Sequence, residues 1–177
     1  MKLCLVRHGK TVFNTLGKMQ GRENIPLSDE GRKECLELKQ RISNNHYDIC
    51  FSSPLLRAIE TAVILVGDKV EIYPDSRLTE RELGELEGHF REDYDVDKYW
   101  DYNLNSGDEG VEKIQDIFKR CNDFLNYLKQ KYKDEVILIV AHNATIKALY
   151  HIINNTKLDG VLTNIKVDNC CYFEFDI

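Results

Sequence analysis

Long apolar stretches are missing from this sequence of 177 residues. No run approaches the roughly 18 apolar residues that a membrane-spanning helix needs. The first seven residues offer only a short apolar run before a charge, so we do not expect a signal peptide either. These absences predict a cytoplasmic protein with no membrane partner.

Basic residues are not in excess. The chain has 24 Lys and Arg against 30 Asp and Glu, which gives a formal net charge of −6. A general nucleic-acid-binding protein carries a basic surface, so nucleic acid is not expected as a partner. A small anionic substrate is not excluded, because a few arginines in one cleft can hold a phosphate on an acidic protein.

Metal-site and linker patterns are absent as well. The six cysteines show no C-x-x-C or Cys/His metal spacing, and several lie in apolar runs, as small buried hydrophobic residues do. We therefore expect reduced core thiols and no metal or other cofactor. With only three prolines, no repeat and no Pro/Gly/Ser-rich linker, residues 1–177 are predicted to form a single domain.

Short apolar runs alternate with amphipathic segments along the chain. The runs predict strands at 3–6, 47–51, 70–73, 136–140 and 171–175. Helices are predicted after the cap Ser28, after Ser53 with Pro54 in the first helical position, over about 110–131, and from near Asn143. This alternation indicates an α/β fold, a three-layer sandwich with a mostly parallel central sheet flanked by helices.

Two histidines follow predicted strands directly. His8 comes after the run 3–6 and Arg7, and His142 comes after the run 136–140 and Ala141. Ligands of such folds bind at the carboxyl ends of the strands, so both imidazoles could face one crevice. His8 could attack phosphorus, with Gly9 allowing close approach, or it could be a structural cap of the strand. His142 has the same two interpretations.

Other candidates are ambiguous when taken singly. Arg7 offers a planar fork of donors that suits phosphate oxygens. Arg57 falls in the first turn of a predicted helix, where a cation is disfavoured unless an anion is near, although it could be an ordinary solvated arginine. Glu80 is one of several acids in the segment 78–88, any of which could be a solvated loop carboxylate.

Four motifs together resemble those of the histidine phosphatase superfamily, which includes the phosphoglycerate mutases. Arg7-His8-Gly9-x-Thr11-x-x-Asn14 resembles the family's first signature, and the segments 52–62, 78–88 and 140–142 resemble its second motif, its acid-bearing loop and its second histidine segment. The motifs occur in the family's order and span residues 7 to 142, which is most of the chain.

The resemblance implies a role for each candidate residue. His8 attacks the phosphate in line and becomes a phosphohistidine, while Glu80 protonates the leaving oxygen and then helps to deprotonate the attacking water. No metal is needed, because fixed cations stabilise the transferring group. The residues implied to bind and orient the phosphoryl oxygens are Arg7, Asn14, Arg57 and His142.

The sequence departs from the family pattern at three places. Asn143 replaces the usual glycine after the second histidine, and we expect its tolerance of left-handed backbone to preserve the turn. Lys147 stands where arginine is frequent and is expected to lie outside the chemistry. The segment around Glu109 resembles the family's Gly-Glu-Ser helix start, but Gly110 replaces the serine. Whether this loop contacts the substrate is therefore left open.

Hydrolysis is the favoured function among three candidates. The family's mutases use a longer insertion after the acid loop and a carboxy-terminal extension, whereas here a short lid-like insert at about 89–109 is followed by a chain that ends after its last strand. We therefore expect a metal-independent phosphatase acting on small-molecule phosphate monoesters. The alternatives are mutase-type phosphoryl transfer and a non-catalytic module that binds a phosphorylated ligand.

Residues 89–102 of the insert combine five aromatic residues with five acids and two cations, Arg91 and Lys98. Such a lid would match a doubly phosphorylated sugar poorly and a monophosphate with an apolar or ring-bearing group better. The alternative of equal weight is a solvated acidic loop whose aromatic side chains pack on the core. The three histidines outside the motifs are expected at the surface or hydrogen-bonded: His46, His89 and His151.

Overall fold

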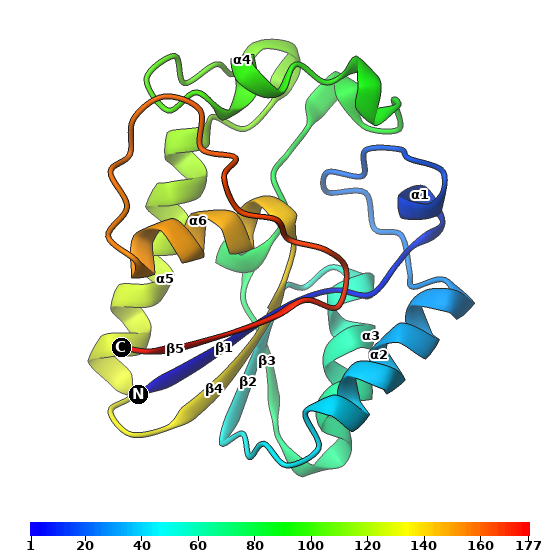
Figure 1. The fold of residues 1–177 in the computed structure, drawn as a ribbon, viewed down its shortest axis with the longest axis vertical. Helices are drawn as coiled ribbons and strands as arrows, with labels where there is room; N and C mark the ends of the chain where they lie inside the picture. The colour runs from blue at the N-terminus through cyan, green and yellow to red at the C-terminus, as the bar shows by residue number, and fades with distance from the viewer.

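A five-stranded sheet forms the centre of the computed structural model, which describes all residues 1–177 (Figure 1). The strand order is β3-β2-β4-β1-β5. The first four strands in the chain run parallel, and β5 pairs antiparallel with β1 at one edge. The strands are β1 (Lys2–Arg7), β2 (Ile49–Ser52), β3 (Ile72–Pro74), β4 (Val136–Ala141) and β5 (Tyr172–Asp176).

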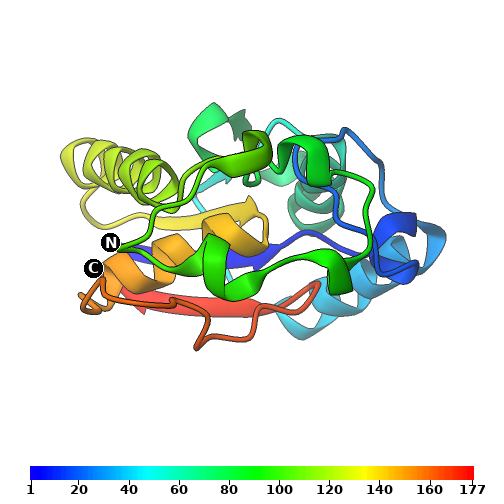
Figure 2. The ribbon, with the colours of Figure 1, turned by 90° about the horizontal axis from the view of Figure 1, so that it is seen from above.

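Helices cover both faces of the sheet. In Figures 1 and 2, α5 and α6 lie on one side of it and α2 and α3 on the other. The helices are α1 (Val12–Thr15), α2 (Asp29–Arg41), α3 (Leu56–Val66), α4 (Val96–Trp100), α5 (Ile114–Lys131) and α6 (Asn143–Ile153). The predicted three-layer α/β sandwich with a mostly parallel sheet is therefore confirmed.

Alternation of side chains along the strands divides the core in two. In β1, Leu3 and Leu5 belong to the apolar cluster under α5 and α6, whereas Cys4 and Val6 belong to the cluster under α2 and α3. Strands buried on both faces read as continuous apolar runs, which is why β1 and β4 could be located from sequence. The six cysteines carry free thiols, and five of them are buried.

Two predicted helix starts are wrong. The helix α3 begins at Leu56 rather than at Pro54, and no side chain caps its first turn. The Ser53 hydroxyl accepts from the Leu55 N–H at 3.3 Å, just ahead of the helix, and is also bonded to His142. The helix α5 begins at Ile114 rather than near residue 110, since the Glu112 N–H donates to the Glu82 carbonyl and holds the preceding segment extended. The predicted cap Ser28 is correct, and its side chain accepts from the Gly31 N–H.

The segment 89–109 lies across the carboxyl ends of the strands, at the top of Figure 1 and nearest the viewer in Figure 2. It contains α4 and two single 3₁₀ turns, Arg91–Asp93 and Asp108–Gly110. None of the helices is both long and apolar enough to span a bilayer.

Candidate active site

A pocket of about 340 Å³ opens at the carboxyl end of the sheet, beside the ends of β1 and β4. Five of the six predicted site residues line it, namely Arg7, His8, Asn14, Arg57 and Glu80. The sixth, His142, is fully buried and does not line the pocket, but its ring centroid lies 5.1 Å from that of His8. The fold thus brings all four sequence motifs to one place.

His8 is held as a neutral imidazole. Its Nδ1 lies 2.7 Å from the Gly9 carbonyl oxygen, which can only accept, so Nδ1 carries the proton and Nε2 keeps its lone pair. Burial lowers the pKa of His8 well below 6.5, and the charges of Arg57 and Arg7 lower it further. An unprotonated nitrogen in a cationic pocket is the form that can attack phosphorus.

The ring of His142 lies next to that of His8. Its Nε2 is 2.7 Å from the Ser53 hydroxyl, which orients the ring, and its Nδ1 is buried without a partner. Burial lowers its pKa well below the ordinary value, with a further contribution from the charge of Arg57. Arrival of an anionic phosphoryl group would oppose that shift and favour the protonated, donating form.

Two buried guanidinium groups are fixed by backbone carbonyls. Arg7 donates from Nη1 to the Val167 oxygen at 2.7 Å, and Arg57 donates to the oxygens of Glu23 and Gly21 at 2.6 and 2.8 Å. Burial lowers the pKa of Arg57 to about 10. In both arginines Nε is buried without a partner, as is Nδ1 of His142. Unpaired buried polar atoms are rare in proteins, and these three, two guanidinium donors and an imidazole nitrogen, are typical of a site that an anion completes.

The amide of Asn14 is oriented by its neighbours. Its Oδ1 accepts from the Thr11 N–H at 3.1 Å and from Asn169 Nδ2 at 3.3 Å. Both partners are donors, so the oxygen must face them and the amide nitrogen is left as a free donor on the pocket side of the residue. The predicted hydrogen bond from Asn14 to a phosphoryl oxygen fits this orientation.

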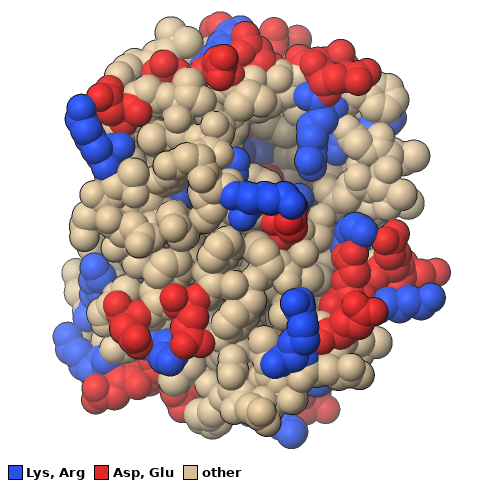
Figure 3. Space-filling model, in the orientation of Figure 1, with Lys and Arg blue, Asp and Glu red and all other residues tan.

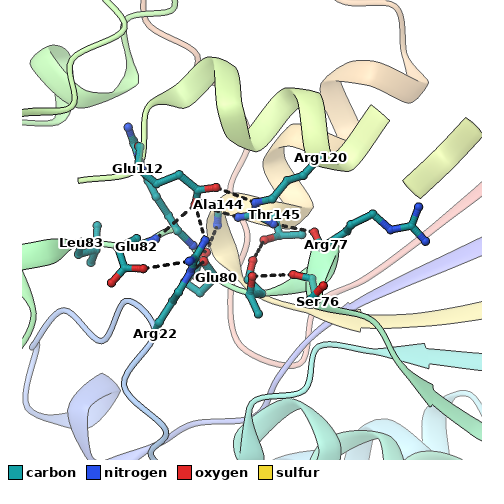
Figure 4. Close-up of polar contacts among 12 residues, drawn as sticks. Arg22, Ser76, Arg77, Glu80, Glu82, Leu83, Glu112, Arg120, Ala144 and Thr145 are labelled. Carbon is teal, nitrogen blue, oxygen red and sulfur yellow. Dashed lines mark hydrogen bonds and ion pairs between the residues drawn. The ribbon is translucent and has the colours of Figure 1, made fainter. Parts of the chain in front are cut away.

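Glu80 is the only carboxylate that lines the pocket. Its Oε1 accepts from the backbone N–H groups of Ala144 and Arg81, each at 3.0 Å, and Oε2 has no protein partner (Figure 4). The Ala144 N–H belongs to the first turn of α6, where the helix dipole favours a carboxylate. This contact separates Glu80 from the nearby acids, which face elsewhere: Glu82, Glu85 and Glu87.

A polar network fixes the loop that carries Glu80. Arg22 donates from Nε to the Glu80 carbonyl at 3.2 Å and pairs with Glu82 at 2.9 Å and Glu112 at 3.3 Å (Figure 4). Arg120 pairs with the same Glu112 at 2.8 Å. On the other side of Glu80, the Thr145 hydroxyl donates to the Thr79 carbonyl at 2.6 Å. The carboxylate is therefore positioned by both α5 and α6.

Several polar and charged lining residues, Thr163 among them, were not among the predicted site residues. Gln20, buried beside Thr11, accepts from its hydroxyl at 2.7 Å, and Arg81 donates to the Tyr99 carbonyl at 2.7 Å, tying the insert to the Glu80 loop. Proximity to Glu80 in the sequence was the only signal for Arg81. The other lining residues that were missed or set aside are the cations Lys18, Arg91 and Lys147.

Lys147, which was expected to lie outside the chemistry, is a lining residue of the pocket. It lines the pocket with its ammonium 4.7 Å from the centre of the Trp100 ring. Asn143 also lines the pocket, but it is the first residue of α6 and needs no left-handed backbone, so the expected reason for its tolerance is wrong. Glu109 points away from the pocket and accepts from the Tyr99 hydroxyl at 2.5 Å.

The insert contributes cations and aromatic residues to the pocket rather than acids. Its lining residues are Arg91, Tyr94, Val96 and Trp100, and none of its acids is among them. Figure 3 shows a hollow on this face bordered by Lys and Arg side chains, with Asp and Glu gathered along the edge above it. The insert therefore does not present an acidic surface to the pocket, which was the expected reason for a poor match to doubly phosphorylated sugars. No group of three or more His, Cys, Asp or Glu side chains is arranged to hold a metal ion.

Known proteins share this sequence pattern and architecture. A family model of the histidine phosphatase superfamily (branch 1) matches residues 3–177. An uncharacterised phosphatase, PhoE, of Bacillus subtilis is 34% identical over 96% of this chain and 84% of its own. A 2,3-bisphosphoglycerate-dependent phosphoglycerate mutase of Rhizobium etli is 30% identical over 90% of this chain and 83% of its own.

A solved structure agrees with these relatives. The phosphoserine phosphatase of Entamoeba histolytica, in complex with 3-phosphoglyceric acid, superposes with a TM-score of 0.81 at 30% identity and covers 99% of this chain and 90% of that one. The chain belongs to the histidine phosphatase superfamily. Its fold, its family and its relatives support phosphatase activity, as the sequence predicted.

Proposed function

We propose that this protein is a metal-independent phosphatase of small-molecule phosphate monoesters that works through a phosphohistidine at His8. The observation that supports this most strongly is a neutral imidazole whose Nε2 is free, set in a pocket end with three unpaired buried polar atoms. A substrate phosphate would satisfy all three atoms while meeting the nucleophile. The proposed compartment is the cytoplasm, and the proposed partner is the phosphorylated substrate itself.

The proposed reaction has two steps. In the first, His8 Nε2 attacks phosphorus in line, the bond from phosphorus to the ester oxygen breaks, and Glu80 Oε2 gives that oxygen a proton. In the second, Glu80 takes a proton from water, which attacks the phosphohistidine and releases inorganic phosphate and free His8. Arg7, Arg57 and His142 stabilise the charge on the transferring oxygens in both steps, with Asn14 as a further donor.

Two other functions remain less well supported. Mutase-type transfer uses the same phosphohistidine, and several relatives are phosphoglycerate mutases. The insert here, however, has only about twenty residues, and the pocket is open beside it in Figure 3. A transferase must exclude water from its phosphoenzyme, which favours hydrolysis here. A non-catalytic binding module would not need the nucleophile and the acid that this pocket retains.

Hydrolysis of a generic monoester in the presence of a chelator tests this proposal. The wild type should release inorganic phosphate at an unchanged rate, and His8→Ala should abolish release. His46→Ala is the matched control, since His46 is exposed and pairs only with Asp48. A strict requirement for added magnesium, or full activity of His8→Ala, would contradict the proposal.

A further inference from the structure

Two buried thiols are in contact close to the nucleophile. Cys35 lies in α2 and Cys170 in the turn that precedes β5, and their Sγ atoms are 3.6 Å apart. A disulfide joins sulfurs about 2.05 Å apart, so the two atoms need to approach by about 1.5 Å to form a bond. No step proposed for phosphate hydrolysis uses either thiol.

A separate cavity of about 460 Å³ opens beside this pair. Cys170 and Asn169 line it together with four residues of α2, namely Glu34, Glu37, Gln40 and Arg41. The cavity shares no lining residue with the substrate pocket, so a small molecule can reach Cys170 without passing through that pocket. Two carboxylates against one cation disfavour an anionic oxidant such as glutathione disulfide, whereas uncharged hydrogen peroxide fits.

The contact makes the pair easier to oxidise than an isolated buried thiol. The Cys170 thiol donates to Cys35, which lowers the pKa of Cys35, and the thiolate is the form that reacts with peroxides. The thiolate attacks one peroxide oxygen, the O–O bond breaks, and a sulfenic acid and hydroxide result. Hydroxide takes the proton of the remaining thiol, whose sulfur then displaces hydroxide from the sulfenic acid. Two thiols and one hydrogen peroxide thus give one disulfide and two molecules of water.

The Cys35 sulfur packs against the residue that follows His8. A Cβ added at Gly9 would lie 2.6 Å from Cys35 Sγ, so glycine leaves the room that the sulfur occupies. The Gly9 N–H donates to the Thr61 hydroxyl at 3.1 Å, and Cys35 Sγ contacts the same hydroxyl at 3.6 Å. A displacement of this sulfur therefore acts on the backbone of Gly9, whose carbonyl oxygen holds His8 Nδ1 at 2.7 Å.

The turn that carries Cys170 holds the other side of the same loop. The Cys170 N–H donates to the Arg7 carbonyl at 3.1 Å, and Asn169 Nδ2 donates to the His8 carbonyl at 2.9 Å and to Asn14 Oδ1 at 3.3 Å. Because α2 is held by its own backbone hydrogen bonds, closing the pair must move mainly this turn. Such a movement shifts the nucleophile and a phosphate ligand together, and a misplacement of about 1 Å can cost about 10²-fold in rate.

We infer that Cys35 and Cys170 form an oxidative modification site, in which a peroxide joins the two thiols in a disulfide that displaces the His8 loop and inactivates the enzyme reversibly. Both thiols are free in the resting protein, so the enzyme is active until the oxidant arrives. A thiol reductant reverses the bond by exchange. The loss of activity rests on the proposed function, whereas formation of the disulfide does not.

Treatment of the whole protein with hydrogen peroxide, followed by peptide mapping and assay with p-nitrophenyl phosphate, tests the inference. We expect one disulfide, between Cys35 and Cys170, a fall in kcat of about 10- to 100-fold, and recovery after dithiothreitol. The variants Cys35→Ala and Cys170→Ala should each hydrolyse the ester at nearly the wild-type rate and should resist the peroxide.

Cys171→Ser is the matched control, because Cys171 is the adjacent and more exposed thiol. This variant should be inactivated as the wild type is. Inactivation that persists in Cys35→Ala and Cys170→Ala, a disulfide that leaves activity unchanged, or the absence of this disulfide after peroxide treatment would overturn the inference. Failure of the reduced wild type to hydrolyse any phosphate ester would instead refute the proposed function, and the peptide map would still show whether the pair is oxidised.

Discussion

Replacement of Glu80 by glutamine removes the proposed proton donor while keeping the geometry of the loop. Glutamine retains a side-chain oxygen that can accept from the N–H groups of Ala144 and Arg81, as Glu80 Oε1 does at 3.0 Å. The position of Oε2, which has no protein partner, becomes an amide nitrogen. The change therefore affects acid–base chemistry far more than structure.

The size of the effect depends on the leaving group. General acid catalysis contributes typically about 10²–10⁴-fold when the departing oxygen is strongly basic. Glu80→Gln should therefore slow release of an alkyl alcohol by this factor. A nitrophenolate leaves readily without a proton, so its release should slow by less than about tenfold.

Single-turnover formation of the phosphoenzyme is the appropriate assay, because the later attack of water is common to both substrates. An alkyl phosphate and a nitrophenyl phosphate are compared in wild type, Glu80→Gln and Glu85→Gln. The Glu85 variant is the control, since that side chain is exposed and does not line the pocket. Equal losses on both substrates in Glu80→Gln would refute the assignment of the leaving-group acid.

Two further predictions follow from the buried cations and imidazoles. The Arg57 guanidinium bonds two backbone carbonyls and still has its Nε free for phosphate, a geometry that lysine cannot reproduce although it keeps the charge. The kcat/KM of Arg57→Lys should therefore fall at least about tenfold. A variant equal to wild type would return Arg57 to a structural role. Burial lowers the pKa of His8, His142 and His151, so below pH 6.5 the unfolded chain binds protons that the folded chain does not. The free energy of unfolding, measured with urea, should therefore decrease as the pH is lowered below 6.5, by up to about 1.4 kcal/mol per pH unit for each histidine. A constant free energy of unfolding between pH 6.5 and 5.5 would contradict this.

Local signals in the sequence located most of the fold. The runs that became β1 and β4 are apolar because both faces of these strands are covered, and the cap Ser28 acts within its own turn. Prediction failed where a distant partner decides the local structure. Ser53 looked like a helix cap, and its hydroxyl does accept from the Leu55 N–H, but the helix starts only at Leu56. The same hydroxyl bonds to His142, 89 residues further along the chain, which the sequence does not indicate.

The same distinction between local signals and distant partners holds for the residues of the candidate site. Arg7 and His8 follow a strand whose end could be predicted, whereas Glu80 could not be separated from the acids around it until the Ala144 N–H was seen to hold it. Lys147 was noted only as a replacement of a frequent arginine and was expected to lie outside the chemistry. Only the three-dimensional approach of Trp100 on the insert shows that its ammonium lies in the pocket. His151 was expected at the surface or hydrogen-bonded, yet it is buried with both ring nitrogens unpaired.

Chemical identification of the phosphorylated residue is the decisive test of a phosphohistidine at His8. The wild type and His8→Ala are mixed with a phosphate monoester labelled in its phosphoryl group and quenched in alkali during turnover, and the labelled peptide is sequenced by mass spectrometry. We expect one phosphate on the imidazole of His8 in the wild type, stable to alkali and labile to acid, and none in His8→Ala. Label on any other residue, or turnover by the wild type with no phosphoenzyme at all, would contradict it.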